Sequence, residues 1–578
     1  METYYIGLAT TFHDPALAVV NGAGEVVFAE ASERPLQTKR AICCAADVRE
    51  TVRRVIKDHC DPKASFVVAK AWSRRMYGFM ELMKPLGAVN HERLPSTSGT
   101  MTKFLVEKHV MMAQIWLQYA SFQQSGGNFA DIVRTDFGNQ NVKFVKISHH
   151  QAHAATACFT SPFEQAACMV IDGQGEWGSI TYFEYRDGKL RQLHRVKGEE
   201  SLGILYSICT IFCGFDPEKG EEWKVMGLAP YGKLDPEIHA LFKNLVTVKG
   251  LDIKYPPLRR IEEWFARMKP KSRGPNTPAL EMADLAYTTQ YFYAEVMTAL
   301  LNNFHKMGLS DNLALGGGCG LNSSFNGQIV GRTPFKHLHV PSAPADDGNA
   351  LGCALLAYYQ DHPDRQRKAV VQSPYLGSSM SKKTIENLAR FGQIPKLRHL
   401  PKTLAEETAA LLADGKLVGW IQGRAEFGPR ALGNRSILAD PRPPDMKEKI
   451  NALVKFREEF RPFAPSILDE FGPEYFENYQ VSPYMERTLA FRESARAKVP
   501  AIVHVNATGR LQSVRREWNE RYYDLIRAFY DRTGVPMLLN TSFNIMGKPI
   551  IHSVEDALGL FYTTGLHALV IEEYLIEK

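Results

Sequence analysis

The stretch Ser148-His149-His150-Gln151-Ala152-His153-Ala154 stands just before an apolar run, 165–171, that ends at Asp172. If the stretch is helical, His149 and His153 are i and i+4 and lie on one face. Neutral imidazole is the commonest metal-ligating side chain, so two stacked rings can share one ion. The alternative is a polar helix start whose histidines hydrogen-bond to their neighbours. The stretch therefore predicts a helix before a strand, with a candidate metal site.

The apolar run itself predicts a buried strand. Its carboxyl end reads Asp172-Gly173-Gln174-Gly175-Glu176. An acidic residue at that position suits a metal or phosphate site, because the following glycines let the backbone approach a ligand closely. Asp-Gly is also a common turn pair, so a simple acidic turn explains the same residues.

Near the N-terminus, two β-rich runs, 4–10 and 16–20, flank the loop Thr11-Phe12-His13-Asp14-Pro15. Strand, polar loop and strand predict a hairpin. The loop places His13 and Asp14 at a strand end, where binding groups often lie. A turn without a chemical role accounts for the two residues equally well.

A predicted strand at 312–315 runs into the glycine loop Gly316-Gly317-Gly318-Cys319-Gly320-Leu321-Asn322. Strand, glycine loop and helix start present backbone N–H groups to phosphate. The loop is neither a Walker A motif nor a spaced G-x-G-x-x-G. Further on, Asp346 and Asp347 begin a predicted helix, either as partners of its dipole or with one of them as a metal ligand. The segment 220–232 predicts a loop near a site, and 279–306 a long helix.

Composition sets the broad class. The chain has 578 residues, 45% hydrophobic and 23% charged, with a net charge of +6. This length predicts two large or three smaller domains, and the modest charge argues against a nucleic-acid coat. The sequence contains no run of about 18 apolar residues, so no membrane-spanning helix is expected. Nine cysteines without Cys-x-x-Cys, and no basic n-region, predict a reduced cytoplasmic protein.

The strongly charged segment 361–375 predicts a linker between a first domain at 1–360 and a second at 376–578. In the second domain, arginines alternate with glycine and proline rather than with the acidic partners of a solvated helix. Guanidinium groups on rigid loops suit phosphate and carboxylate. RNA is the weaker alternative, because the interleaved aromatic side chains that stack on single strands are sparse.

Eight motifs that occur in one order resemble the O-carbamoyltransferases of the nodulation and antibiotic-tailoring type, over nearly the whole chain. The motifs are His13-Asp14-Pro15, His149 to Ala154, Val170 to Glu176, Lys224 to Ala229, Gly317 to Asn322, Gly428 to Gly433, Arg461 to Ser466 and Leu539 to Asn544.

This resemblance implies an α/β protein with two domains. The first is Kae1-like, of the actin/sugar-kinase/Hsp70 fold group, and the second is YrdC-like, an α/β fold around a positively charged cavity. The implied activity is ATP-dependent O-carbamoyl transfer. The C-terminal domain makes carbamoyl adenylate from carbamoyl phosphate and ATP. The N-terminal domain moves the carbamoyl group to a hydroxyl of a small-molecule acceptor, a natural product or sugar, and releases AMP.

The resemblance also implies roles in the first domain. A divalent metal, with Fe(II) expected, is held by His149, His153, Asp172 and Asp346, and His150 becomes a bystander. Asp346 rather than Asp347 follows from alignment on Gly348. Residues implied for adenylate binding are Gly317, Gly318, Asn322 and Lys224. His13 is the implied general base, which takes the acceptor proton.

For the second domain, the residues implied to bind carbamoyl phosphate and ATP are Arg430, Lys455, Arg510, Ser542 and Asn544. Additional phosphate contacts are expected from Arg424, Arg435, Arg457 and Arg461. The segment 70–140 matches no pattern and is expected to shape the acceptor pocket. We expect no membrane or nucleic-acid partner, and a homodimer is compatible with the resemblance.

Three other functions share features with this sequence. A tRNA threonylcarbamoylation enzyme shares both domain types, but the net basicity is small and the block Gly428 to Gly433 is specific to the first family. A hydrogenase-maturation carbamoyltransferase is disfavoured, since its zinc-finger cysteine pairs are absent. A protein of another class, which binds nucleotide and metal without turnover, would bind ATP and form no pyrophosphate.

Overall fold

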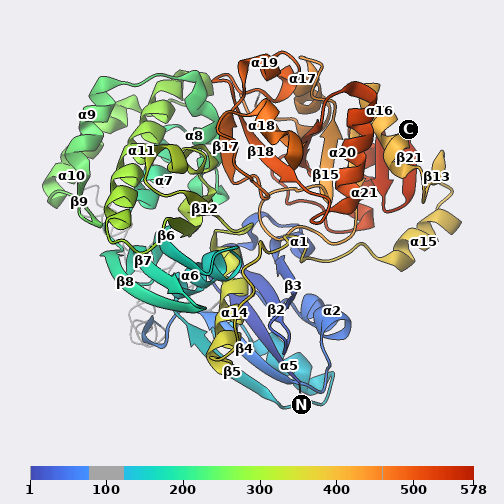
Figure 1. Ribbon diagram of the computed structural model, residues 1–578, viewed down its shortest axis with the longest axis horizontal. Coiled ribbons are helices and arrows are strands. Elements are labelled where there is room, and N and C mark those ends of the chain that lie inside the picture. The colour runs from blue at the N-terminus through green and yellow to red at the C-terminus, as the bar shows by residue number, and fades with distance from the viewer. Residues whose placement is uncertain (1, 77–122, 459) are drawn as a thin grey trace, which may run out of the picture.

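The computed structural model describes residues 2–76, 123–458 and 460–578. They form a sheet-rich N-terminal part, a helical lobe beside it and a C-terminal α/β part (Figure 1). Most of the expected acceptor segment 70–140 lies outside the described residues. No helix in the described ranges has the length and hydropathy of a membrane span.

The N-terminal part contains two five-stranded sheets with the same topology. Their orders are β3-β2-β1-β4-β5 and β12-β11-β6-β7-β8. In each, three antiparallel strands are followed by two parallel ones. The strands are β1 Thr3–Ala9, β2 Ala16–Val20, β3 Val26–Ala31, β4 Ser65–Ala71, β5 Val142–Ile147, β6 Gln165–Gly175, β7 Gly178–Arg186, β8 Lys189–Lys197, β11 Asn312–Gly316 and β12 His337–His339. This duplication confirms the predicted actin/sugar-kinase-like architecture.

Two helices lie between the sheets and pack on each other. They are α6 (His149–Phe159), which follows β5, and α14 (Asn349–Asp361). Small residues allow the close contact: a Cβ on Gly352 would lie 1.9 Å from the carbonyl oxygen of Ala152, and one on Gly7 would lie 1.8 Å from that of Ala350. Both helices start where strands end, so their N-termini converge at one edge of the two sheets.

The helical lobe is inserted between β8 and β11, and the longest helix, α11, runs through its core. Its helices are α7 Leu202–Phe212, α8 Glu222–Leu228, α9 Pro236–Leu245, α10 Leu258–Met268 and α11 Ala283–His305, with a short hairpin of β9 Thr247–Lys249 and β10 Asp252–Lys254. The loop predicted at 220–232 is wrong: most of it is α8, because Val225 and Leu228 bury one apolar face despite the glycines around them.

The C-terminal part is a nine-stranded mixed sheet, β13-β21-β20-β14-β15-β19-β16-β18-β17, covered by helices. The strands are β13 Leu397–His399, β14 Val418–Ile421, β15 Arg435–Ala439, β16 Ala464–Leu468, β17 Arg487–Ala490, β18 Thr508–Val514, β19 Met537–Ser542, β20 Ala568–Ile571 and β21 Tyr574–Glu577. The helices are α15 Lys382–Phe391, α16 Leu404–Ala413, α17 Met446–Ile450, α18 Gly472–Tyr475, α19 Glu493–Arg496, α20 Glu520–Thr533 and α21 Val554–Thr563. A single apolar core supports the sheet. The division at 361–375 stays a prediction.

Short elements complete the N-terminal part: α1 Glu33–Leu36, α2 Arg49–His59, α5 Gly127–Thr135, α12 Ser323–Asn326 and α13 Ile329–Arg332. Of these, α12 contacts the edge strand β17. Asn326 Nδ2 donates to the Glu486 carbonyl at 3.0 Å, and a Cβ on Gly327 would lie 2.0 Å from that of Thr488. The edge of the large sheet is therefore fitted against the glycine loop of the N-terminal part.

Gly317 has a positive φ of 89°, and a Cβ there would lie 2.2 Å from the carbonyl oxygen of Ile171. We expect Gly317→Ala to lower the free energy of unfolding by about 3 kcal/mol, since a strained φ and a backbone clash add. Gly534 has a similar φ of 71°, but a Cβ there would meet no atom of the described residues within 4 Å, its chain neighbours aside, so Gly534→Ala should cost only about 1 kcal/mol. Chemical denaturation of both variants measures the difference. Equal losses would contradict the close approach of Ile171.

His339 is buried at the end of β12, with its Nε2 3.2 Å from Thr160 Oγ1. Burial, and then the nearby Arg487 and Arg367, lower its pKa to about 3. In the unfolded chain this histidine is protonated below about pH 6.5, whereas in the folded protein it stays neutral down to about pH 3. Protonation therefore favours the unfolded chain, and stability is lost as the pH falls below about 6.5. This residue should remove about 2 kcal/mol between pH 7 and pH 5. Melting temperatures should therefore fall less over this range in His339→Gln, and an equal fall would refute the prediction.

Candidate functional site

The converging ends of three segments bring together His149, His153, Asp172 and Asp346. The first two begin α6, Asp172 lies near the end of β6, and Asp346 precedes α14. The two Nε2 atoms are 3.2 Å apart, His149 Nε2 is 3.2 Å from Asp172 Oδ2, and His153 Nε2 is 3.3 Å from Asp346 Oδ1. One donor atom from each residue lies within 4.8 Å of the others. Two nitrogens and two oxygens aimed at one point fit a shared divalent cation.

The electrostatics of this group favour ionised carboxylates. Burial raises the pKa of Asp172, but hydrogen bonds from His149 and His153 outweigh it and hold that pKa well below its usual value. Burial lowers the pKa of His153, but its bonds to Asp172 and Asp346 raise it to about 9. The Asp172 and Asp346 carboxylates thus favour positive charge at this point, which is where a cation would fit.

The structure distinguishes Asp346 from its neighbour. Asp346 faces the two histidines, whereas Asp347 Oδ1 accepts from the N–H of Gly348 at 3.0 Å and caps the following turn. Burial, and then the nearby Asp14 and Glu33, raise the pKa of Asp347 to about 7. His150 lies apart from the quartet: its Nδ1 is 2.6 Å from Thr181 Oγ1. Asp346 is therefore placed beside the two histidines, and Asp347 and His150 are not.

Two further polar residues, Glu176 and Asn349, contact the histidines of this group. Glu176 Oε1 accepts from the main-chain N–H of His149 at 3.0 Å and from that of Ser73 at 2.6 Å, so a carboxylate stabilises the start of α6. Asn349 is buried, with Nδ2 3.1 Å from His153 Nε2 and 3.4 Å from His149 Nδ1. Only the contact with His149 Nδ1 is made to the ring nitrogen that faces away from the carboxylates, and contacts of that kind fix ring orientation in metal sites. Asn349 was not predicted from the sequence, although it stands at the start of a helix, two residues after a pair of aspartates.

His13 lies next to the quartet, with its Nδ1 3.9 Å from Asp346 Oδ2. That Nδ1 is 2.9 Å from Asp14 Oδ2, which also accepts from Arg40 Nη2 at 3.1 Å. Burial lowers the pKa of His13, but Asp14 and then Asp346 raise it above its usual value. When Nδ1–H donates to Asp14, Nε2 keeps its lone pair and can accept a proton. Arg40 comes from an irregular loop, 37–44, whose sequence carries no signal for this role.

A cavity of about 2380 Å³ joins the N-terminal and C-terminal parts. Its wall includes His13, Asp172 and Asp346 at one end and Lys455, Arg430, Arg510 and Ser542 among its C-terminal residues. The structure therefore brings the two sets of predicted residues to one continuous space.

The residues predicted for adenylate binding lie along the N-terminal wall, with one exception. Gly318, Asn322 and Lys224 line the cavity. Gly317 does not; it makes the turn that lets the loop pass over Ile171. The N–H of Gly318 donates to Asp172 Oδ1 at 3.3 Å, and Asn322 caps α12 by accepting from the N–H of Phe325 at 3.1 Å.

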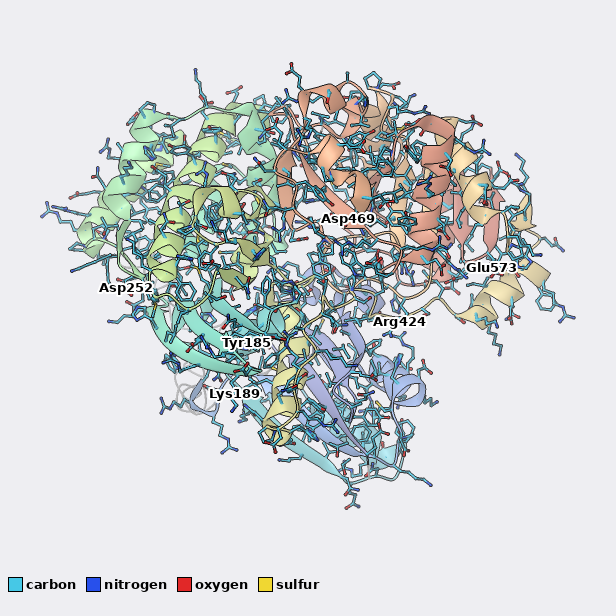
Figure 2. All side chains as sticks on the ribbon, in the orientation of Figure 1. Tyr185, Lys189, Asp252, Arg424, Asp469 and Glu573 are labelled. Carbon is cyan, nitrogen blue, oxygen red and sulfur yellow. The ribbon has the colours of Figure 1, made fainter. Side chains whose placement is uncertain are left out.

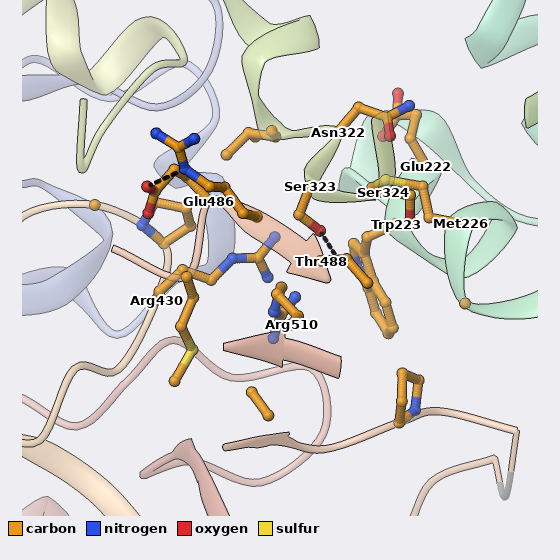
Figure 3. Close-up of a pocket in the computed structure, with 18 of the residues that line it drawn as sticks. Glu222, Trp223, Met226, Asn322, Ser323, Ser324, Arg430, Glu486, Thr488 and Arg510 are labelled. Atoms are coloured by element: carbon orange, nitrogen blue, oxygen red, sulfur yellow. Dashed lines mark hydrogen bonds and ion pairs between the residues drawn. The ribbon is translucent and has the colours of Figure 1, made fainter. Parts of the chain in front are cut away.

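Cations without acidic partners gather on the C-terminal wall. Among the described residues, no carboxylate forms an ion pair with Arg430, Lys455, Arg457 or Arg510. The guanidinium groups of Arg430 and Arg510 point into the same part of the cavity, across from Trp223 and Ser323 (Figure 3). Burial lowers the pKa of Arg430 to about 10 and that of Arg510 well below its usual value. Unpaired guanidinium groups at a cavity wall favour an anionic ligand.

Lys455 lies deeper, at the end of a π-helical turn, Asn451–Lys455. Its Nζ donates to Asn544 Oδ1 at 2.8 Å, to the Asn544 carbonyl at 2.9 Å, and to the carbonyl of Ser542. Ser542 Oγ donates to Asn544 Oδ1 at 2.7 Å. Lys455, Ser542 and Asn544 are thus one hydrogen-bonded unit, as the prediction grouped them.

Arg461 of the C-terminal part and Lys224 of the N-terminal part share one acidic partner, Glu458. Glu458 pairs with Arg461 at 2.6 Å and with Lys224 at 3.3 Å. The Arg461 guanidinium lies 4.2 Å from the ring centroid of Trp223 on α8. Both cations are therefore balanced by an acid in this state, unlike Arg430 and Arg510.

The predicted phosphate contacts at Arg424 and Arg435 are not at the cavity. Arg424 lies at the junction of the first sheet and the C-terminal part (Figure 2), where it donates to the carbonyls of Val27 at 2.8 Å and Gly377 at 3.0 Å. Arg435 is fully buried and donates to four main-chain carbonyls, including those of Gln422 and Ser378. The guanidinium groups of Arg424 and Arg435 donate to main-chain carbonyls instead of facing the cavity. Both predictions are therefore corrected: these arginines stabilise the fold.

Comparison with known proteins gives a consistent result. Residues 4–355 match the family model described as Carbamoyltransferase N-terminus, and 409–578 match that described as Carbamoyltransferase C-terminus. An uncharacterized protein of Synechocystis sp. is 32% identical over 100% of this chain and 97% of its own length. The nodulation protein NolO of Bradyrhizobium diazoefficiens is 38% identical over 75% of this chain and 79% of its own. NolNO of Sinorhizobium fredii is 38% identical over 78% of this chain and 66% of its own.

Proposed function

Since this chain belongs to the carbamoyltransferase family, we propose that it is an ATP-dependent O-carbamoyltransferase whose two reactions use the two ends of one cavity. The observation that carries the proposal is the cavity wall itself: unpaired cations of the C-terminal part and the His13–Asp14 pair of the N-terminal part face the same space.

The first reaction forms carbamoyl adenylate. By mass balance, carbamoyl phosphate, ATP and one water give carbamoyl adenylate, phosphate and pyrophosphate. Arg430, Arg457, Lys455 and Arg510 bind the phosphates, and Ser542 with Asn544 holds Lys455 in place. The cations are preorganised before substrate arrives, so they stabilise charge at the α-phosphorus without reorganisation. Arg461 joins them when an anion displaces Glu458.

The second reaction transfers the carbamoyl group to oxygen. His13 Nε2 takes the proton of the acceptor hydroxyl as that oxygen bonds to the carbamoyl carbon, and the bond from this carbon to the adenylate oxygen breaks to release AMP. Asp14 holds the tautomer and stabilises the imidazolium that forms. Gly318, Asn322 and Lys224 hold the adenylate against the loop.

The donor set of His149, His153, Asp172 and Asp346 fits a divalent metal, and Fe(II) suits a mixed nitrogen and oxygen set. When bound, the metal supplies a positive charge that orients an adenylate phosphate and favours its departure. Asn349 and Glu176 keep the ligands in position.

Pyrophosphate release from ATP, measured with and without carbamoyl phosphate, tests the proposal. We expect release that depends on carbamoyl phosphate, and AMP release that additionally depends on an acceptor. A signal independent of carbamoyl phosphate, or none, would instead favour a protein that binds nucleotide and metal without turnover.

The acceptor is a hydroxylated small molecule in this proposal. A thermal-shift screen of sugars and hydroxylated natural products would identify it, because a ligand that binds only the native state raises the melting temperature. The tRNA alternative predicts instead that transfer requires tRNA.

A further inference from the structure

Arg34, on the short helix α1, is a buried arginine of the N-terminal part that contacts the loop leading to Arg430. The residue is 3% exposed, and its Nη2 donates to the carbonyl of Gly428 at 2.7 Å. Its Nη1 has no hydrogen-bond partner among the described residues. A buried guanidinium with an unpaired nitrogen stabilises a fold poorly. The contact with Gly428 therefore points to a role in placing the loop.

The start of this loop is fixed by the N-terminal part. Phe427 is 2% exposed and belongs to the apolar core around the two five-stranded sheets. Gly428 has a positive φ of 119°, and a Cβ there would lie 2.2 Å from the carbonyl oxygen of Ser342. Pro429 follows, with a φ fixed by its ring, and leads directly to Arg430. The N-terminal part therefore sets the direction in which Arg430 leaves the loop.

The far end of the loop is closed within the C-terminal part. Glu426 Oε1 accepts from the main-chain N–H groups of Leu432 at 2.7 Å, Asn434 at 2.8 Å and Arg435 at 3.1 Å. The residues between the two anchors, 429–431, line the cavity. Since Glu426 fixes one end, the remaining freedom of the loop lies at its start, where the arginine of α1 holds it.

We propose that Arg34 is a positioning residue for the first reaction: by holding the carbonyl of Gly428, it directs the Arg430 guanidinium into the cavity. The inference rests on the proposed binding of phosphate groups by Arg430. The Arg430 and Arg510 guanidinium groups point into the same part of the cavity and repel each other (Figure 3). Without a fixed loop, Arg430 would turn away from Arg510, and the anion site would lose one of its cations before any substrate arrives.

Calorimetric binding of inorganic pyrophosphate tests this role in a double-mutant cycle. Arg430→Met should raise the Kd by about 10–100-fold, since a hydrogen bond to a charged group is lost. Arg34→Met should raise it at least about tenfold, because a misplaced group loses most of its effect. The double variant should bind within about threefold of Arg430→Met alone, because Arg34 acts through Arg430. Arg34→Met combined with Arg510→Met should instead lose close to the product of the two single effects.

An unchanged Kd in Arg34→Met, or the same additivity in both pairs, would overturn the proposal. Additivity in both pairs would mean that Arg34 supports the fold as a whole. If Arg430→Met itself leaves the Kd unchanged, the proposed anion site is misplaced and this proposal falls with it. An effect of Arg430→Met without one of Arg34→Met refutes only the role of Arg34. Binding needs no turnover, so a failure of pyrophosphate release is a separate result.

Arg424→Met is the matched control, because it also removes an arginine that donates to carbonyls at the junction of the two parts. It should leave the Kd for pyrophosphate within about threefold of the wild type, since it acts on neither Arg430 nor its loop. Arg34→Lys keeps one donor for the Gly428 carbonyl and should also stay within about threefold. A loss in Arg34→Lys equal to that in Arg34→Met would overturn the proposal.

The wild type decides if Arg34→Met does not fold. Pyrophosphate should slow amide hydrogen exchange in 33–37 as well as in 428–431, because the loop and α1 hold each other. Protection confined to 428–431 would overturn the proposal.

Discussion

Arg510→Met should give a protein that is more stable than the wild type and that forms pyrophosphate at least about 100-fold more slowly. The structure gives the Arg510 guanidinium no acidic partner among the described residues, and Arg430 and Arg457 repel it. Replacing an uncompensated charge by an apolar side chain of similar length should raise the free energy of unfolding by about 1–2 kcal/mol. Losing one preorganised cation from a phosphate site costs about 10²–10³ in rate. Chemical denaturation and pyrophosphate release measure the two effects.

Arg435→Met provides the contrast, since it also removes a buried arginine from the same domain. Arg435 is hydrogen-bonded to four main-chain carbonyls, so its loss leaves buried acceptors unpaired. This variant should be less stable than the wild type. If Arg510→Met is destabilised to the same degree as Arg435→Met, Arg510 supports the fold and the anion site must be sought elsewhere along the cavity.

Arg510 and Arg435 have different environments that the local sequence does not predict. Each has a glycine one or two residues before it, and both were predicted to contact phosphate. The local sequence does not predict whether a guanidinium contacts carbonyl oxygens or a cavity, because this depends on how the chain folds around it: one acceptor of Arg435, Ser378, is 57 residues away. Arg424 makes the same point: one of its acceptors, Val27, is 397 residues away.

Each member of the metal-type quartet has a local signal, although the complete set of four was implied only by the family resemblance. His149 and His153 have helical spacing, Asp172 ends an apolar strand, and Asp346 starts a helix. The duplicated topology then brings strand ends and helix starts to one edge, so the four groups meet. Asp14 was visible for the same reason, whereas Arg40 was not, because it lies in an irregular loop with a positive φ of 59°.

Glu458 was missed for a different reason. Glu458 reads in the sequence as one acid among arginines. Only the approach of α8 shows that it joins Lys224 of the N-terminal part to Arg461 of the C-terminal part.

His13→Ala should reduce carbamoyl transfer, followed as acceptor-dependent AMP release, by about 10²–10⁴-fold, while pyrophosphate release that depends on carbamoyl phosphate survives. The side chain is 35% exposed at the cavity wall, and it contacts the N-terminal group of ionisable residues and none of the C-terminal cations. Its loss therefore removes a proton acceptor from one reaction and leaves the phosphate-binding groups of the other unchanged.

Asp14→Asn separates a base from a merely structural histidine. An asparagine at this position can no longer accept the Nδ1 proton with a full charge, so the pKa of His13 falls and the favoured tautomer changes, although the ring stays in place. Transfer should fall in Asp14→Asn too, with pyrophosphate release again retained. Loss of both reactions in His13→Ala would mean that His13 maintains the shared cavity, and that the proton is taken by another group.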